Sequence, residues 1–290
     1  MINKINKISV FGSTGFVGSN FCKLYEDEVV KIPRQQRHPT TNDILYLIST
    51  TDNYNVYTDP FIDIDTNLKV LIETLETCKK RKTLGKEAVF NFVSSWFVYG
   101  KTDDLPASED SLCNPSGFYS ITKYAAERLL ISYCETFDLK YRIFRLSNVL
   151  GETDQGVSNK KNAIQLMIQK LCSGEEINLY HNGDVIRDYL YIDDVSRAMF
   201  HCIRHAPTNE IINIGSGHPH KIGDLVNYVK EKINSKSKIN PIKPPKFHKI
   251  VQIRNMFLNT EKLNSLGFQP ESSIEEALDK IIKKYNREKK

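Results

Sequence analysis

Three glycines at three-residue spacing, Gly12, Gly15 and Gly18, stand between an apolar run and a helical pattern near the start of this 290-residue chain. Glycine suits a strand-to-helix turn that must adopt unusual dihedral angles and approach a pyrophosphate closely. The helix that follows offers unpaired N–H groups and a positive dipole end to phosphates. A tight turn without a ligand is the alternative. We expect a dinucleotide site, with cofactor contacts from Gly12, Thr14, Gly15, Phe16, Val17 and Gly18.

Apolar runs alternate with helical patterns along the first half of the chain, which indicates an α/β protein with a parallel sheet. The patterns predict strands at residues 5–11, 28–32, 43–50, 88–95 and 139–146. They predict a first helix, after the glycine turn, that ends near residue 26, and two further helices at residues 63–81 and 117–137.

The rhythm changes after Gly151, where the polar residues 152–161 are typical of a loop. Further helices are expected at 162–173, 193–204, 221–233 and 273–287, and short strands near 177–180, 186–191 and 210–214. Residues 236–249 contain three prolines and are expected to form a rigid surface connection.

These patterns predict a Rossmann-type doubly wound parallel sheet with a smaller C-terminal α/β lobe that binds the substrate. Residues 1–150 are expected to form the dinucleotide-binding domain, and residues 151–290 mainly the substrate lobe. Residues 190–215, approximately, are expected to return to the first lobe. A cleft between the lobes is the expected binding site.

Composition excludes several other classes of protein. The net charge of +5 is too small for this length to indicate nucleic-acid binding. The six cysteines have no close spacing, so neither a metal site nor a disulfide framework is expected. No apolar run approaches the roughly 20 residues of a membrane span, and the polar N-terminus does not resemble a signal peptide. We therefore expect a cytoplasmic protein without membrane or nucleic-acid partners.

The end of the second strand bears on the choice of nicotinamide cofactor. An acidic residue there binds the ribose 2′-hydroxyl of NAD, whereas an arginine accommodates the 2′-phosphate of NADP. Residues 31–37 contain no acid but include Arg34 and Arg37. These arginines favour NADP(H), with NAD(H) as the alternative if both are solvated loop charges.

Tyr119 and Lys123 are four residues apart within a predicted helix and therefore share one face. A nearby ammonium favours the phenolate and makes tyrosine a better acid–base group, and Lys123 can also bind the nicotinamide ribose. Ser95 ends a buried strand, at the sheet edge where α/β proteins bind ligands. The alternatives are a surface Tyr–Lys pair and a serine that caps a strand end.

Taken together, the motifs resemble the extended short-chain dehydrogenases, the NAD-dependent epimerase/dehydratase family that acts on sugar nucleotides. The matching segments are GSTGFVG (12–18), Asn67 with LETC (75–78), SSWFVYG (94–100), YSITK (119–123), RLSNVLG (145–151), RDYLYIDDV (187–195) and INIGSG (212–217).

The resemblance implies roles for particular residues. It selects Ser95, with Tyr119 and Lys123, as the catalytic set, and it implies that Asn148 and Arg187 hold the phosphates of the nucleotide sugar. An arginine suits that task because its planar fork pairs bidentately with phosphate oxygens. The alternatives are a strand-end cap for Asn148 and a surface ion pair for Arg187. We further expect cofactor contacts from Ser49, Thr50 and Asn67, and a homodimer formed through the Tyr119 helix and the helix before it.

The two residues that follow Ser95, Trp96 and Phe97, limit the set of reactions that we expect. Family dehydratases carry Thr-Asp-Glu where this chain has Ser95-Trp96-Phe97, and enzymes of the fucose-synthase type carry a cysteine at the position of Phe97. We therefore expect an NADPH-dependent reductase of a nucleotide-diphosphate 4-keto-(6-deoxy)sugar that serves polysaccharide biosynthesis. An NAD-dependent 4-epimerase is the second choice, and a catalytically silent dinucleotide-binding module is the alternative from another class.

The chain departs from the family in one segment. Only nine residues separate Arg34 from Ile44, where family members fit a further strand. The shortened segment predicts a sheet with fewer strands and an adenine pocket that is built differently.

Overall fold

The computed structural model describes residues 6–51, 53–85, 87–154 and 162–287. Its centre is a six-stranded sheet in which every neighbouring pair is parallel. The strand order is β10 (Glu210–Ile214), β5 (Lys140–Leu146), β4 (Val89–Ser95), β3 (Asp43–Tyr46), β1 (Ile8–Phe11) and β2 (Val29–Lys31).

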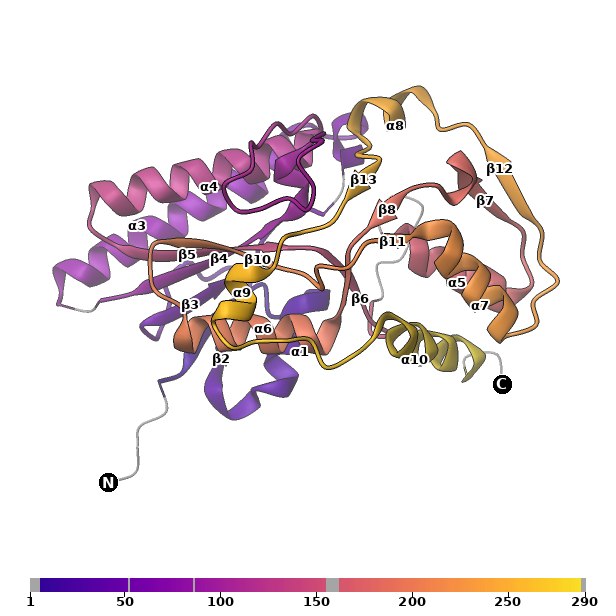
Figure 1. The fold of residues 1–290 in the computed structure, drawn as a ribbon. Coiled ribbons are helices and arrows are strands. Elements are labelled where there is room, and N and C mark those ends of the chain that lie inside the picture. Colours follow the sequence, from indigo (N-terminus) through magenta and orange to yellow (C-terminus); the bar gives the residue numbers. More distant parts are fainter. Residues whose placement is uncertain (1–5, 52, 86, 155–161, 288–290) are drawn as a thin grey trace.

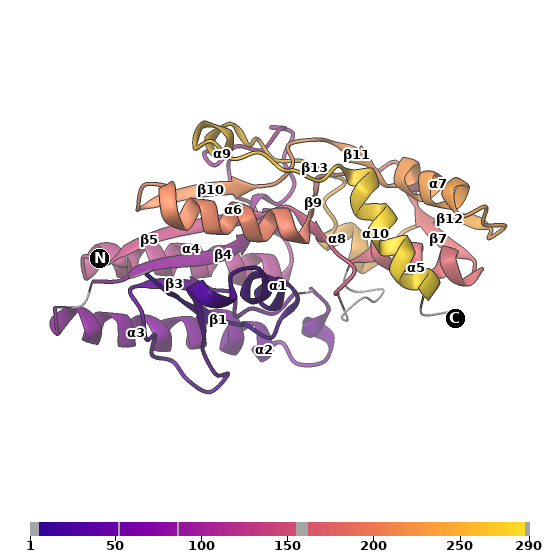
Figure 2. The ribbon, with the colours of Figure 1, turned by 90° about the horizontal axis from the view of Figure 1, so that it is seen from below.

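Helices cover both faces of this sheet (Figures 1 and 2). One face packs on α1 (Phe16–Leu24) and α6 (Ile192–His205), and the other packs on α3 (Val70–Thr83) and α4 (Phe118–Thr136). Successive strand residues alternate between the two cores, so that Val10 joins the first and Phe11 the second. This double coverage explains why the strands are apolar on both sides.

The smaller lobe is built mainly from the C-terminal part of the chain. Its core lies among α5 (Ala163–Ser173), α7 (Ile222–Lys232) and α10 (Ile274–Arg287). Short strands complete it: β6 (Asn148–Leu150) with β9 (Tyr189–Tyr191), β7 (Ile177–Tyr180) with β12 (Ile239–Ile242), and β8 (Ile186–Arg187) with β11 (His220–Lys221) and β13 (Asn255–Met256). The predicted Rossmann-type doubly wound sheet with a smaller C-terminal α/β lobe is confirmed.

The segment between β2 and β3, residues 32–42, contains no strand. β2 is therefore the last strand at its end of the sheet, and β1 lies between it and β3. This agrees with the prediction that the shortened segment removes a strand.

Four predicted elements differ from those in the structure. The predicted strand 43–50 is shortened to β3, which ends at Tyr46. The predicted helix 63–81 consists of α2 (Phe61–Ile64), a π-helical turn (Asp65–Lys69) and α3. The predicted strand 186–191 divides into β8 and β9 at Asp188, whose carboxylate accepts hydrogen bonds from the loop at Ser216. Residues 236–249 are not merely a connection.

That segment contains β12 and the start of α8 (Lys246–Val251). Pro241 is tolerated because β12 belongs to a two-stranded sheet, in which one side of each strand has no ladder partner. Of the predicted loop 152–161, residues 155–161 lie outside the described residues, as does Ile5 of the first predicted strand. Within the described ranges, no helix has the length and apolar composition that a membrane span requires.

A buried ion pair joins α4 to β5. The carboxylate of Glu127 accepts from Arg145 Nη2 at 2.8 Å, and the two side chains are 1% and 3% exposed. Arg145 Nη1 also donates to the carbonyl oxygen of Glu109 at 3.1 Å. The pair therefore fixes α4 to the sheet from within the protein interior.

We expect Glu127→Ala to lower the free energy of unfolding by about 3–5 kcal/mol, because it leaves the Arg145 charge buried and unpaired. Urea unfolding followed by circular dichroism measures this loss. Glu135→Ala, an exposed position on the same helix, is the matched control and is expected to stay within about 0.5 kcal/mol of the parent protein. Equal effects of the two substitutions would contradict the interpretation.

Candidate active site

A cavity of about 520 Å³ opens where the carboxyl ends of the sheet strands face the smaller lobe. Most of the predicted site residues line it: Gly12, Gly15, Phe16, Val17, Gly18, Ser49, Thr50, Ser95, Tyr119, Lys123, Asn148 and Arg187. Thr14, Arg34, Arg37 and Asn67 are not among its lining residues. The cavity thus brings the glycine turn, the Ser–Tyr–Lys set and two residues of the smaller lobe together.

The glycine turn requires glycine for steric reasons. Gly12 has a φ of +79°, and a Cβ there would lie 3.0 Å from the carbonyl carbon of Leu47. A Cβ on Gly18 would lie 2.2 Å from the Gly12 oxygen, so α1 could not pack so closely on β1. Because the same residues line the cavity at the start of a helix, where N–H groups lack intrahelical partners, the turn fits a dinucleotide pyrophosphate.

Ser95 is the last residue of β4 and lies at the N-terminus of the short 3-10 helix Trp96–Tyr99. Its Oγ accepts a hydrogen bond from the Phe97 N–H at 3.3 Å. The Phe97 ring meets the ring of Tyr119 edge-on, with 6.0 Å between centroids. The strand end and the catalytic helix therefore meet at the cavity wall.

Tyr119 is buried on the first turn of α4. Burial raises the pKa of its phenol to about 12, the Asp63 carboxylate acts in the same direction, and a side-chain hydrogen bond with Ser95 opposes them. The Tyr119 side chain is therefore a protonated phenol at neutral pH, and the expected lowering of its pKa by the Lys123 ammonium is not found. The protonated phenol is the form that can donate a proton.

Lys123 lies one helical turn further along α4 and is also buried. Its Nζ donates to the carbonyl oxygen of Val93 at 2.7 Å and lies 4.1 Å from the centroid of the Phe92 ring. Burial lowers the pKa of its ammonium to about 7, against an opposing effect of Glu127. Its charge at neutral pH therefore depends on what fills the cavity.

Asn67 connects strand end and catalytic helix instead of facing the cavity. Its Oδ1 accepts from Ser49 Oγ at 3.0 Å and from the Thr50 N–H at 2.9 Å. Its Nδ2 donates to Thr122 Oγ1 at 2.9 Å, between Tyr119 and Lys123 on α4. The side chain is thus engaged in holding the residues around the cavity.

Asn53 and Gly117 are positioning residues that the sequence pattern did not reveal. Asn53 Oδ1 accepts from the backbone N–H of Tyr119 at 3.1 Å. A Cβ at Gly117 would lie 2.1 Å from that oxygen, so glycine at the helix start allows the contact. In the sequence, only the Gly117-Phe118 pair before Tyr119 could have indicated an unusual contact at the start of this helix.

Arg187 and Asn148 line the same cavity from two different small sheets of the smaller lobe, on β8 and β6. Arg187 is buried, and its guanidinium donates to the carbonyl oxygens of Ile253 and Arg254 and lies 5.1 Å from the Trp96 ring. Burial lowers the pKa of Arg187 to about 10. Asn148 Nδ2 donates to the Asp188 carbonyl oxygen at 2.9 Å. Both side chains are therefore held in place by backbone groups.

A contact between the lobes was also missed. Tyr54 and His248 line the cavity from opposite lobes, and Tyr54 Oη lies 2.5 Å from His248 Nε2. The Tyr54 ring is 5.1 Å from that of Phe247. Two tyrosines soon after a strand at the ligand-binding edge, Tyr54 and Tyr57, were the available signal.

Metal chemistry has no support in the described part of the chain, where no group of three His, Cys, Asp or Glu side chains could hold an ion. None of the six cysteines forms a disulfide, and all except Cys113 are buried.

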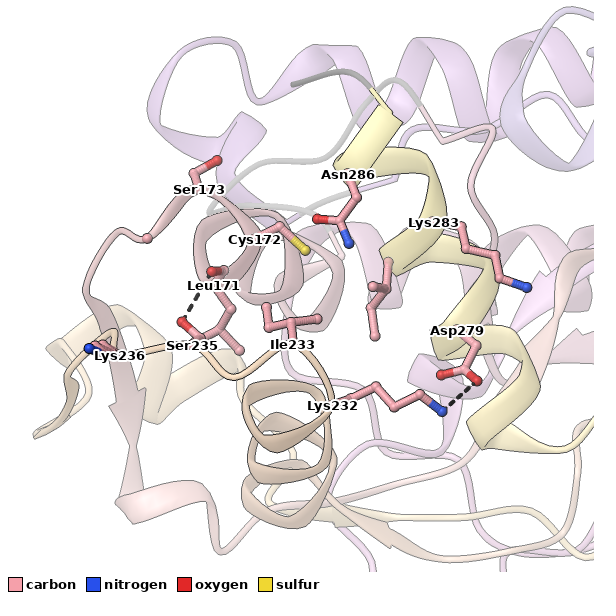
Figure 3. A pocket seen from close by; sticks show the side chains of 12 residues that line it. Leu171, Cys172, Ser173, Lys232, Ile233, Ser235, Lys236, Asp279, Lys283 and Asn286 are labelled. Carbon is pink, nitrogen blue, oxygen red and sulfur yellow. Dashed lines mark hydrogen bonds and ion pairs between the residues drawn. The ribbon is translucent and has the colours of Figure 1, made fainter. Parts of the chain in front are cut away.

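A second cavity, of about 530 Å³, lies in the smaller lobe where α5 and α7 end beside α10 (Figure 3). Lys232 forms an ion pair with Asp279 at 2.9 Å, and Ser235 Oγ donates to the Leu171 carbonyl oxygen at 3.2 Å. Lysines near helix C-termini compensate the negative end of the helix dipole. The positive charge of Lys232 is therefore explained by its position at the C-terminus of α7. This cavity is assigned no ligand.

Comparison with known proteins identifies the family. Residues 43–215 match the model of the NAD-dependent epimerase/dehydratase family. Because the match covers more than half of the chain, the protein belongs to this family, and the resemblance drawn from its motifs is confirmed.

Both candidate activities occur among its relatives. A putative UDP-glucose 4-epimerase of Methanocaldococcus jannaschii is 27% identical over 79% of this chain and 72% of that protein. A dTDP-4-dehydro-6-deoxyglucose reductase of Escherichia coli is 28% identical over 69% of this chain and 61% of that protein. The UDP-glucose 4-epimerase of Thermotoga maritima, solved with UDP-glucose, superimposes with a TM-score of 0.86 at 25% identity, covering 98% of this chain and all of that one.

The lowered pKa of Lys123 generates a stability prediction. The pKa of Lys123 is about 7 in the folded protein, whereas its usual value is 10.5. Between these two pH values, the unfolded chain binds more protons at this residue than the folded protein does. Stability therefore rises with pH across this window, and the full penalty of burying the charge is present below it.

We expect the difference in unfolding free energy between Lys123→Met and the parent protein to move in favour of the parent as pH rises through this window. Urea unfolding of both proteins at several pH values measures it, because all other titrating groups cancel in the difference. A difference that does not vary with pH would rule out the lowered pKa.

Proposed function

We propose that this protein reduces the C4 ketone of a nucleotide-diphosphate 4-keto-(6-deoxy)sugar with NADPH. The observation that carries the proposal is the buried phenol of Tyr119 beside Ser95 on the cavity wall. Reduction of a ketone needs a proton donor at the carbonyl oxygen, and the phenol of Tyr119, which is protonated at neutral pH, can serve as that donor. A 4-epimerase must first remove a proton from a hydroxyl, for which a phenolate is the better group.

NADPH, when bound, supplies the hydride that reduces C4. Ser95 donates a hydrogen bond that steadies the developing negative charge on the C4 oxygen, and Tyr119 transfers its proton to that oxygen. Donors placed in advance at such an oxygen contribute a few kcal/mol to lowering the barrier. In this mechanism Lys123, one turn from Tyr119, binds the ribose hydroxyls and, when charged, stabilises the phenolate that remains.

The choice of NADP(H) is supported by the end of β2, where Pro33 and Arg34 stand in place of an acid. Arg34 is exposed, and Arg37 follows one turn later. The proposed cofactor site consists of these two arginines and of Gly12, Thr14, Gly15, Phe16, Val17, Gly18, Ser49 and Thr50. Asn67 holds Ser49 and Thr50 in place by hydrogen bonds.

The substrate assignment is supported by Arg187 and Asn148, which line the cavity from the smaller lobe. A guanidinium surrounded by carbonyl oxygens retains hydrogen-bonding capacity and positive charge for a diphosphate. Trp96 and Phe97 present aromatic rings at the cavity where dehydratases of the family need acid and base groups. The cavity is therefore suited to a sugar whose only reaction is at the ketone.

The second candidate is an NAD-dependent nucleotide-sugar 4-epimerase, which the epimerases among the relatives favour. The two activities differ in whether the dinucleotide is consumed. A silent dinucleotide-binding module would bind without turnover.

We expect the purified protein to oxidise one NADPH for each dTDP- or UDP-4-keto-6-deoxysugar consumed, and Tyr119→Phe to lower kcat by about 10²–10⁴-fold with little change in NADPH affinity. Absorbance of NADPH and chromatography of the sugar nucleotides measure both. Sugar interconversion without net NADPH consumption would identify the epimerase, and binding without turnover the silent module. Full activity of Tyr119→Phe would refute the mechanism.

We also propose that the enzyme is a cytoplasmic homodimer. Exposed apolar side chains recur on one face of α4 and on α2, which begins the helical segment that ends with α3 and precedes α4; this pattern favours helix packing between subunits. They are Phe61, Ile62, Ile64, Phe118, Ile121 and Leu129.

We expect Ile121→Glu to convert the dimer to a monomer, because it places a charge in the apolar contact. Sedimentation velocity measures the mass of the parent protein and the variant. Leu84→Glu, an exposed apolar position at the far end of α3, is the control and should leave the mass unchanged. A monomeric parent protein would refute the proposal.

A further inference from the structure

The shortened segment that follows β2 is fastened to α3 by side chains of the helix. Thr77 Oγ1 donates to the carbonyl oxygen of Arg37 at 2.9 Å. Arg81 donates to the carbonyl oxygens of Pro39 and Thr41, at 2.9 and 3.2 Å. The backbone of this segment is therefore held in place independently of the Arg37 side chain.

This segment lies at the cofactor edge of the sheet. β1 and β2 are parallel with Val10 opposite Lys31, and the Ile32 N–H donates to the Val10 oxygen at 3.0 Å. The chain beyond Ile32 therefore leaves the sheet at the same edge as the glycine turn beyond Phe11. Under the proposed function, this is the end of the site that receives the adenosine ribose.

The Arg37 side chain is already engaged by a carboxylate. Its Nε donates to Glu73 Oε2 at 3.0 Å, and its Nη1 donates to the Arg34 carbonyl oxygen at 2.8 Å. The Arg37 and Glu73 side chains are 26% and 42% exposed, so an approaching anion can reach both. Carboxylate and phosphate compete for the same guanidinium donors, and Glu73 also repels a phosphate.

We propose that Glu73 is a specificity-determining residue, which holds Arg37 in an ion pair that a ribose 2′-phosphate must share or displace, and so moderates the preference for NADP(H) over NAD(H). This inference rests on the proposed use of NADP(H). NAD(H) has no 2′-phosphate and does not compete with Glu73. The residue therefore acts on one dinucleotide and not on the other.

The test is the pair of dissociation constants for NADPH and NADH, measured by fluorescence titration of the full chain. In Glu73→Gln, we expect NADPH to bind about two- to five-fold more tightly, in line with the modest strength of a part-exposed ion pair, and NADH to bind unchanged. Glu76→Gln removes the same charge from the same helix without touching Arg37 and should change neither constant. An unchanged NADPH to NADH ratio in Glu73→Gln, or an equal shift for both dinucleotides, would overturn the proposal.

A double variant shows whether Glu73 acts through Arg37. If it does, Glu73→Gln has no effect on the NADPH to NADH ratio in an Arg37→Ala background. A retained effect would overturn the role of the ion pair.

Failure of the cofactor assignment itself has a different signature. If Arg34→Ala and Arg37→Ala, singly and together, leave the ratio unchanged, or neither dinucleotide binds, NADP(H) selection by these arginines is wrong and the inference falls with it. If the arginine variants change the ratio and Glu73→Gln does not, only the role of Glu73 is wrong.

Discussion

The hydrogen bonds of Asn67 hold the parts of the active site together. This amide reaches Ser49 and Thr50 beyond the end of β3 on one side and Thr122 on α4 on the other. Tyr119 and Lys123 flank Thr122 on the same helix, so the amide links the cofactor-facing edge of the sheet to the catalytic side chains. Its burial makes each of these hydrogen bonds costly to lose. The positions of Tyr119 and Lys123 relative to the end of β3 thus depend on a residue that does not line the cavity.

The catalytic pair works in an environment that disfavours charge. Burial keeps Tyr119 protonated and brings the pKa of Lys123 down to about 7, while Arg187 supplies positive charge on the facing wall. A ligand with negatively charged phosphates would favour the ammonium form of Lys123 by simple attraction. The charge of Lys123 at neutral pH therefore depends on whether an anion occupies the cavity.

Much of the candidate site could be predicted from the sequence, because several of its parts are determined within short segments of the chain. The glycine spacing, the serine at a strand end and the Tyr–Lys spacing each have a local steric or geometric cause, and the cavity brings them together as expected. The side-chain partners were not predictable, since they depend on tertiary contacts. Nothing near Asn67 indicates that it binds Thr122, and Arg37 reads equally well as free or as paired until Glu73 is seen beside it. The π-helical turn before α3 likewise has no pattern in the sequence.

The missing strand has a consequence for solubility. It leaves β2 at the end of the sheet, where unpaired N–H and C=O groups invite pairing with another molecule. β2 is only three residues long and ends in the exposed Lys31. Pro33, two residues later, has no backbone N–H with which to extend the pairing. The chain could therefore lose a protective outer strand without acquiring an edge on which copies of itself would assemble into fibres.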